Sequence, residues 1–236
     1  MPNRMCARFG GRLAVLAVLV TAVHAAPSMP TDDNEVVERL PPRAGAEWRR
    51  QRAALARDPL QLPLALATAR QSIDRARQLG DPRELGHAQA ALAPWWSRPE
   101  APAVVRLLKA TVLQSQHQFD PALRELEALV DDPRAELAVQ AQATLTRVTL
   151  LQLRGRLAEA QRACEQLADA RFAALGPGLQ RHARACAAEL LSLRGDPRTA
   201  AAQMATLARE DPNDRWLALL RAEAAQRRGD HAEAEA

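Results

Sequence analysis

The apolar and polar positions along the chain follow a helical pattern. Between residues 62 and 76 the apolar residues recur at steps of three and four, as they do on one stripe of a helix. They are Leu62, Leu66, Ala69, Ile73 and Ala76. A helix before this one is expected from Ala44 to Arg57, because Pro59 disfavours helical angles at the preceding Asp58. The pattern predicts consecutive helices separated by short breaks.

A turn signal interrupts the helices at a nearly constant spacing. Glycine tolerates the left-handed angles that end a helix, aspartate caps the next helix, and proline is favoured in its first turn. The turns centre on Gly80, His117, Gly155, Gly195 and Gly229, at increments of 37, 38, 40 and 34 residues. Longer links, such as Arg98 to Ala101 and Leu175 to Gly178, would absorb the extra residues.

The same register repeats after each turn. Five residues on stand small residues and nine on stand larger ones, except in the first unit, which has Leu85 and Gln89 there. Twelve residues on stands a leucine. The residues five positions after the turn are Ala122, Ala160, Ala200 and Ala234. Those nine positions after it are Leu126, Cys164 and Met204, and those twelve positions after it are Leu92, Leu129, Leu167 and Leu207. Small residues let two helices approach closely, while the larger ones fill the contact with the next unit. Because only 3% of the residues are aromatic, alanine and leucine must supply most of the core.

The unit from Gly195 to Gly229, with Asp211-Pro212 between its helices, resembles the tetratricopeptide repeat. The resemblance covers about residues 60 to 236 and is strongest from His117 onward. It implies an all-α, right-handed α-solenoid of antiparallel helix pairs, about four pairs plus a half repeat within residues 44–236. It also implies a non-enzymatic scaffold. The alternative is a globular helical bundle in which the spacing has no structural meaning.

The first 25 residues fit a secretory signal peptide, with cleavage expected after Ala25. Three arginines, Arg4, Arg8 and Arg12, precede an apolar run from Leu13 to Val23. An uncleaved anchor is the alternative, but it needs about 20 apolar residues to cross a bilayer. Residues 26–43 contain four prolines and are expected to be a flexible linker. The sequence thus predicts a periplasmic or secreted protein with no membrane span after cleavage.

Charge and local motifs argue against several classes of function. Removing the three arginines of the leader reduces the formal charge from +4 to +1, so nucleic acid is not an expected partner. The histidines His87, His117, His182 and His231 form no metal-binding or nucleophile-activating motif, and no glycine-rich phosphate loop is present. We therefore expect no enzyme activity, no cofactor and no metal.

The first helix of each pair is the expected binding surface, because the resemblance places first helices on the concave side. Three residues before each turn stand Gln114, Gln152, Ser192 and Gln226, and six before it stand Thr111, Thr149, Glu189 and Glu223. These two polar rows could bond the backbone of an extended peptide from another envelope protein. A merely solvated face would explain them equally well.

A third row stands eight residues before the turn, where the repeat family carries a large hydrophobe. Lys109, Arg147 and Arg221 occupy it, with Ala187 in the remaining unit. These cations could hold carboxylates of a partner. Alternatively, their stems are buried and their charged ends reach water.

Two cysteines remain after the leader, which contains Cys6. Cys164 lies in a second helix and Cys186 in the next first helix. An exported chain can keep a disulfide between them, and otherwise both are small core residues.

Two apolar groups suggest further partners. Trp95 and Trp96 could stack on a glycan, as in an accessory protein of polysaccharide export, or cover the gap between the first two units. No capping helix follows the last turn. Either the chain is truncated, or the apolar side around Trp216, Leu217 and Leu220 is left for a partner or a second copy.

Overall fold

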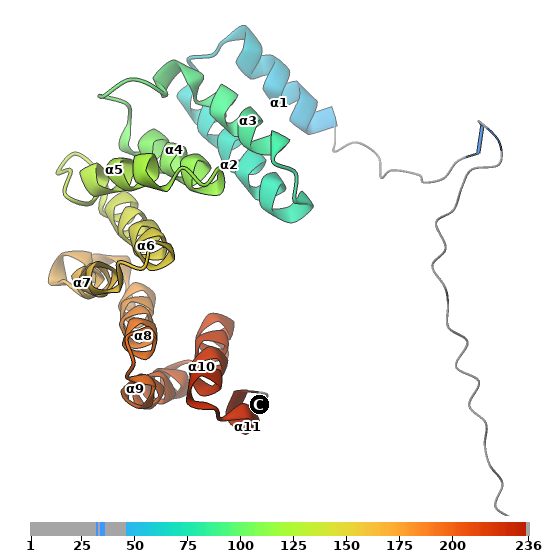
Figure 1. Ribbon diagram of the computed structural model, residues 1–236. Coiled ribbons are helices and arrows are strands. Elements are labelled where there is room, and N and C mark those ends of the chain that lie inside the picture. Colours follow the sequence, from blue (N-terminus) through green and yellow to red (C-terminus); the bar gives the residue numbers. More distant parts are fainter. Residues whose placement is uncertain (1–31, 33, 36–45, 235–236) are drawn as a thin grey trace, which may run out of the picture. The chain divides into compact units, whose positions relative to one another are not determined.

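The computed structural model describes residues 32, 34, 35 and 46–234 (Figure 1). The chain divides into Met1–Ala44 and Gly45–Ala236, and every helix considered below belongs to the second unit. The predicted signal peptide, 1–25, and nearly all of the predicted linker, 26–43, lie outside the described residues. Their assignment stays a prediction.

The described part of the second unit is helical. Its elements are α1 Ala46–Arg57, α2 Leu62–Leu79, α3 Arg83–Ala91, the 3₁₀ helix η1 Ala93–Trp95, α4 Ala103–Ser115, α5 Phe119–Val130, α6 Leu137–Leu153, α7 Leu157–Leu167, the 3₁₀ helix η2 Ala170–Leu175, α8 Pro177–Leu193, α9 Pro197–Glu210, α10 Arg215–Arg228 and α11 His231–Ala234. The helix α1 ends at Arg57, as the following Asp-Pro predicts.

The helices pack as sequential antiparallel pairs. Within the pairs, α2 packs on α3, α4 on α5, α6 on α7, α8 on α9 and α10 on α11. Each second helix also packs on the first helix of the next pair, as α5 does on α6 and α7 on α8. The all-α, tetratricopeptide-like arrangement predicted from the sequence is therefore confirmed, with each pair leaning mainly on its neighbours in the chain (Figure 1).

The five predicted turns share one backbone geometry. The central residue has a positive φ in every case: Gly80 at 63°, His117 at 59°, Gly155 at 70°, Gly195 at 101° and Gly229 at 75°. In the last four turns the following N–H donates to a carbonyl five residues back. These bonds are Gln118 to Leu113, Arg156 to Leu151, Asp196 to Leu191 and Asp230 to Ala225, at 2.8 to 3.0 Å. They satisfy carbonyls that the end of an α-helix leaves without partners.

His117 is the one non-glycine residue with positive φ among those the structure describes. A left-handed conformation costs an ordinary residue about 1–2 kcal/mol. The imidazole packs edge-on against Phe119, with the ring centres 5.6 Å apart. The turn forms despite the missing glycine, since helices on both sides require it.

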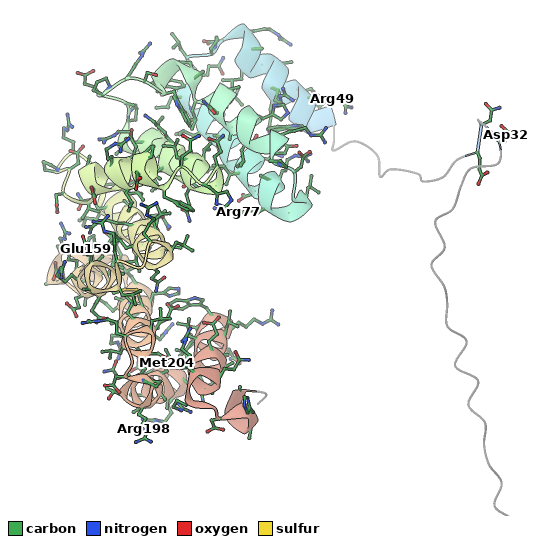
Figure 2. The ribbon with its side chains drawn as sticks, viewed as in Figure 1. Asp32, Arg49, Arg77, Glu159, Arg198 and Met204 are labelled. Atoms are coloured by element: carbon green, nitrogen blue, oxygen red, sulfur yellow. A yellow bond between two sulfur atoms is a disulfide. The ribbon has the colours of Figure 1, made fainter. Side chains whose placement is uncertain are left out.

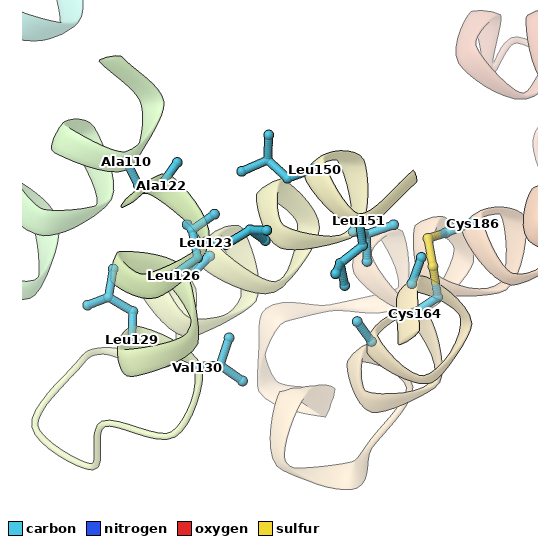
Figure 3. Close-up of a cluster of buried hydrophobic side chains, with 14 of the residues drawn as sticks. Ala110, Ala122, Leu123, Leu126, Leu129, Val130, Leu150, Leu151, Cys164 and Cys186 are labelled. Atoms are coloured by element: carbon cyan, nitrogen blue, oxygen red, sulfur yellow. A yellow bond between two sulfur atoms is a disulfide. The ribbon is translucent and has the colours of Figure 1, made fainter. Parts of the chain in front are cut away.

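The core follows the register counted from the turns. Ala122, Ala160 and Ala200 are fully buried, and so are the residues four positions later, Leu126, Cys164 and Met204. The leucines twelve residues after the turn are buried as well. Figure 3 shows Leu126 and Leu129 of α5 and Leu150 and Leu151 of α6 in one buried cluster. The interior is thus built by packing both within each pair and between successive pairs.

Two expectations about apolar residues need correction. The link expected from Leu175 to Gly178 shrinks to Gly176, because η2 ends at Leu175 and Pro177 already begins α8; Phe172 of η2 is fully buried. At the other end, Leu217 and Leu220 are not left open, because they are buried in a cluster with Met204 and Leu207. The exposed large hydrophobic residue of α10 is Leu219, with 57% of its surface accessible.

Candidate functional site

The polar rows of the first helices meet one another between successive pairs. The amide of Gln152 in α6 donates to a carboxylate oxygen of Glu189 in α8 at 3.3 Å. One pair further on, Arg227 of α10 donates to the hydroxyl oxygen of Ser192 in α8 at 3.3 Å. We call the surface formed by these rows on α4, α6, α8 and α10 the inner face. Its polar residues bridge the first helices, which a row of separately solvated side chains would not do.

Two carboxylates, Glu189 and Glu223, lie close together in the α8–α10 part of the inner face. Burial raises the pKa of Glu189 above its ordinary value, and the nearby carboxylate of Glu223 raises it further. The hydrogen bond from Gln152 and the charge of Arg227 act in the opposite direction. Arg227 also donates to Glu223 at 3.2 Å. The positive charge of Arg227 therefore acts on both carboxylates, Glu189 and Glu223.

The remaining predicted residues of the rows are less constrained. Gln114 is half-buried, whereas Gln226 and Thr149 are exposed. The Thr149 hydroxyl donates to the carbonyl of Leu145 at 3.3 Å, and the Thr111 hydroxyl makes the same bond to its own helix. Ser192 is buried, so the amides of Gln114, Gln152 and Gln226 are the groups of these rows that offer most to a ligand.

The predicted row of cations does not form a second stripe on this surface. Lys109 lies 2.8 Å from a carboxylate oxygen of Glu125 in α5 and above the ring of Trp96. Arg106 contacts the other oxygen of Glu125 at 3.0 Å. Burial acts to raise the pKa of Glu125, but the hydrogen bonds from Lys109 and Arg106 lower it overall. The carboxylate that Lys109 holds belongs to the chain itself.

Arg147 repeats this behaviour in the next pair, where its Nε lies 3.8 Å from a carboxylate oxygen of Glu127 in α5. Arg221 is half-buried on α10. The repeat family usually has a hydrophobe at this position. Here two of the three cations, Lys109 and Arg147, form ion pairs with helix α5 instead.

The inner face continues into α2, which the sequence analysis did not include. A pocket between α2, α4 and α6 is lined by Arg70, Ile73, Asp74, Arg77, Val104, Leu107, Leu108, Thr111 and Gln142. Figure 2 labels Arg77 at this position. Asp74 and Arg77 stand six and three residues before Gly80, so the register of the polar rows could have identified them. With Arg70 they make this end of the face more basic than the α8–α10 end.

The two cysteines are joined. A disulfide links Cys164 of α7 to Cys186 of α8, with the Cα atoms 5.9 Å apart (Figure 3). Both side chains are buried where the second helix of one pair packs on the first helix of the next.

The aromatic pair predicted as a possible glycan platform is used in packing. Trp95 packs against the core cluster around α2 and α3, and Trp96 packs against that cluster and the next one along the chain. A different aromatic contact lies near the end of the array. There, the imidazole of His182 stacks on Trp216 with ring centres 4.4 Å apart.

Among residues 32, 34, 35 and 46–234, no three side chains of His, Cys, Asp or Glu gather closely enough to hold a metal ion. No helix within this part of the chain is both long and apolar enough to cross a bilayer.

Comparisons with known proteins add little. No protein-family model matches the chain, and no curated protein matches it. A solved structure named "MamA MSR-1 C2" is similar to it at 17% sequence identity and a TM-score of 0.47. The match covers 72% of this chain and 90% of that one. The assignment of the fold therefore rests on the repeated turns and the pairing of the helices.

Proposed function

We propose that this chain is an exported, non-enzymatic scaffold that binds an extended segment of another cell-envelope protein along its inner face. The observation that carries the proposal is the bridging of successive first helices by polar side chains, Gln152 with Glu189 and Ser192 with Arg227. Amide groups at this spacing can exchange hydrogen bonds with a peptide backbone whose sequence varies.

The charges on the inner face favour one direction for the bound segment. Two arginines, Arg70 and Arg77, outnumber one carboxylate, Asp74, at the α2 end. Two carboxylates, Glu189 and Glu223, outnumber the guanidinium of Arg227 that acts on them near the α8–α10 end. A segment with acidic residues toward α2 and basic residues toward α10 would match both ends. The reversed segment would place like charges together, so the proposal includes a polarity.

Export is supported by two features of different kinds. The sequence begins with a predicted leader, and the chain contains a buried disulfide. Disulfides persist mainly in oxidising compartments such as the periplasm. A glycan-binding role has less support, because Trp95 and Trp96 pack against the core. Self-association through the end of the array would have to use Leu219, the exposed leucine of α10.

The proposal can be tested by photo-crosslinking in intact cells. A photo-reactive residue at Gln152 or Gln226 should give a discrete crosslinked band that contains a second envelope protein. The matched control is the same residue at Arg162, an exposed position on the second helix α7. Equal crosslinking at Arg162 and at both inner positions would contradict binding along the inner face.

A further inference from the structure

A pocket separate from the inner face lies where α1 crosses α2 and α3. Its lining residues are Arg52, Leu55, Ala56, Pro59, Thr68, His87, Ala90 and Ala91. The pocket has a volume of about 240 Å³. Sites for drug-sized ligands usually have about 300 to 1,000 Å³, so this pocket suits a smaller molecule.

The rim of the pocket carries a cation with no acidic partner. The guanidinium groups of Arg52 and Arg75 each lie 5.7 Å from the centre of the Trp48 ring, which is buried. Arg75 is neutralised by Glu84, at 2.9 and 3.0 Å. No acidic side chain in the described part of the chain pairs with Arg52. Of the two cations on this indole, only Arg52 therefore retains an uncompensated charge.

Arg52 is also held in position from a second side. Its NH1 lies 3.4 Å from Nε2 of His87, and because a guanidinium only donates hydrogen bonds, Nε2 is the acceptor. The imidazole in turn packs against Trp48. A guanidinium fixed by a ring face and an imidazole has already lost part of the conformational freedom that binding an anion would cost.

Thr68 adds an unused polar group to the wall. It is 2% exposed, and its hydroxyl oxygen has no hydrogen-bond partner. Threonines in the other helices behave differently. Thr111, Thr144, Thr146, Thr149 and Thr206 each donate to the carbonyl four residues earlier. A buried hydroxyl without a partner destabilises the folded state, and a ligand that bonds to it would recover that loss.

The rest of the lining is apolar and is supplied by Leu55, Ala56, Pro59 and the two alanines of α3. We propose that the α1–α3 pocket binds a small monocarboxylate with a short hydrocarbon tail. The carboxylate lies against the Arg52 guanidinium and the tail against Leu55, Pro59 and Ala91. The Thr68 hydroxyl donates a hydrogen bond to the ligand. The site does not depend on the peptide scaffold function, and either can fail without the other.

Titration of the full-length protein with hexanoate, followed by ¹H–¹⁵N NMR, tests the proposal. Hexanoate should shift the amide signals of Ala90 and Ala91 in a saturable way. Hexanol lacks the carboxylate and acetate lacks the tail, so both should bind at least about tenfold more weakly. The Arg52→Gln variant should lose about tenfold or more in affinity for hexanoate. The Thr68→Val variant, which keeps the shape of the side chain, should lose about threefold.

The matched control is Arg49→Gln, an exposed arginine on the same helix that does not line the pocket (Figure 2). It should bind hexanoate as the unsubstituted protein does. Circular dichroism of each variant verifies that α1 is still folded. The proposal is overturned if the amides show no saturable shift, if hexanol binds as tightly as hexanoate, or if Arg52→Gln leaves the affinity unchanged.

Discussion

Two contacts between neighbouring pairs use the same register positions but different chemistry. Cys164 stands nine residues after its turn and Cys186 nine residues before the next turn, and a disulfide joins them across α7 and α8. Met204 and Leu220 occupy the corresponding positions of α9 and α10. Those two residues are buried in one apolar cluster without any covalent link. The position relative to the turns thus determines which residues meet, and the residue types determine whether a disulfide or an apolar contact joins them.

The comparison shows why a disulfide could enter this array without disturbing it. Residues at this position of two successive helices are already buried between them, so a pair of cysteines needs no change in the backbone. A covalent link restricts the unfolded chain, whereas an apolar contact stabilises the folded one by burial. The two contacts should therefore respond differently to the same kinds of substitution.

The largest effect is expected from removing the disulfide. The double substitution of Cys164 and Cys186 by alanine should lower the free energy of unfolding by about 3 kcal/mol, because the crosslink closes a loop of moderate length. Hydrogen exchange should become faster in α8 and the helices after it, because each pair depends on the one before. Urea denaturation and exchange mass spectrometry measure these changes. A stability equal to that of the oxidised protein would contradict the expectation.

A slightly smaller loss is expected at the apolar counterpart. Met204→Ala should cost about 2–3 kcal/mol, since a fully buried side chain is replaced by a cavity. The loss caused by Met204→Ala should be the same with and without a reducing agent, and exchange should speed up mainly in α9 and α10. The control is Gln203→Ala at the exposed neighbouring position. If Gln203→Ala were as destabilising, burial would not explain the loss.

The turns provide a third test, on the backbone that fixes the register. Gly195 has a φ of 101°, and a β-carbon there would meet no atom within 4 Å. Gly195→Ala should nevertheless lose about 1–2 kcal/mol, because the conformation itself is unfavourable for L residues. His117→Gly should gain up to about 1 kcal/mol for the converse reason. Thermal denaturation measures both. A gain from Gly195→Ala would show that the turn relaxes easily.

The smallest effect is expected from replacing Glu189 on the inner face of α8. Because burial raises the pKa of Glu189, its ionised form destabilises the folded state near neutral pH. Glu189→Gln should therefore raise the melting temperature slightly at pH 7. The difference should vanish near pH 4, where the carboxyl is largely protonated in both folded and unfolded chains.

The control for this substitution is Glu159→Gln, at a half-buried site in α7 (Figure 2). A hydrogen bond from Arg156 lowers the pKa of Glu159, so its replacement should not stabilise the protein at pH 7. A pH-independent effect of Glu189→Gln would indicate that packing, and not ionisation, is responsible.

The register of turns was predictable because each turn obeys a local rule. Gly155 and Gly195 adopt positive φ where the spacing requires it, and His117 was identified from spacing alone. The buried alanines and leucines followed, since their positions are counted from the turns. The polar bridges of the inner face lie on rows that the sequence identifies, although Arg227 stands one position off the predicted row.

Features that depend on contacts across helices were harder to predict. Phe172 lies just before the link expected from Leu175 to Gly178, and no periodicity marks it as core. For Lys109 and Arg147 the sequence leaves open a partner's carboxylates or water, because nothing in it shows that α5 presents Glu125 and Glu127 to them. The α1–α3 pocket depends on how α1 crosses two later helices, which spacing along the chain does not reveal.

Lys109 is the sole lysine of the chain, and it lies in the middle of α4 with its charge paired to Glu125. A lysine-specific endoprotease consequently has one peptide bond to cut, the one between Lys109 and the fully buried Ala110. Cleavage there requires α4 to unwind from α5. The protein thus contains a natural single-site reporter, in which the rate of appearance of two fragments measures how often this helix opens.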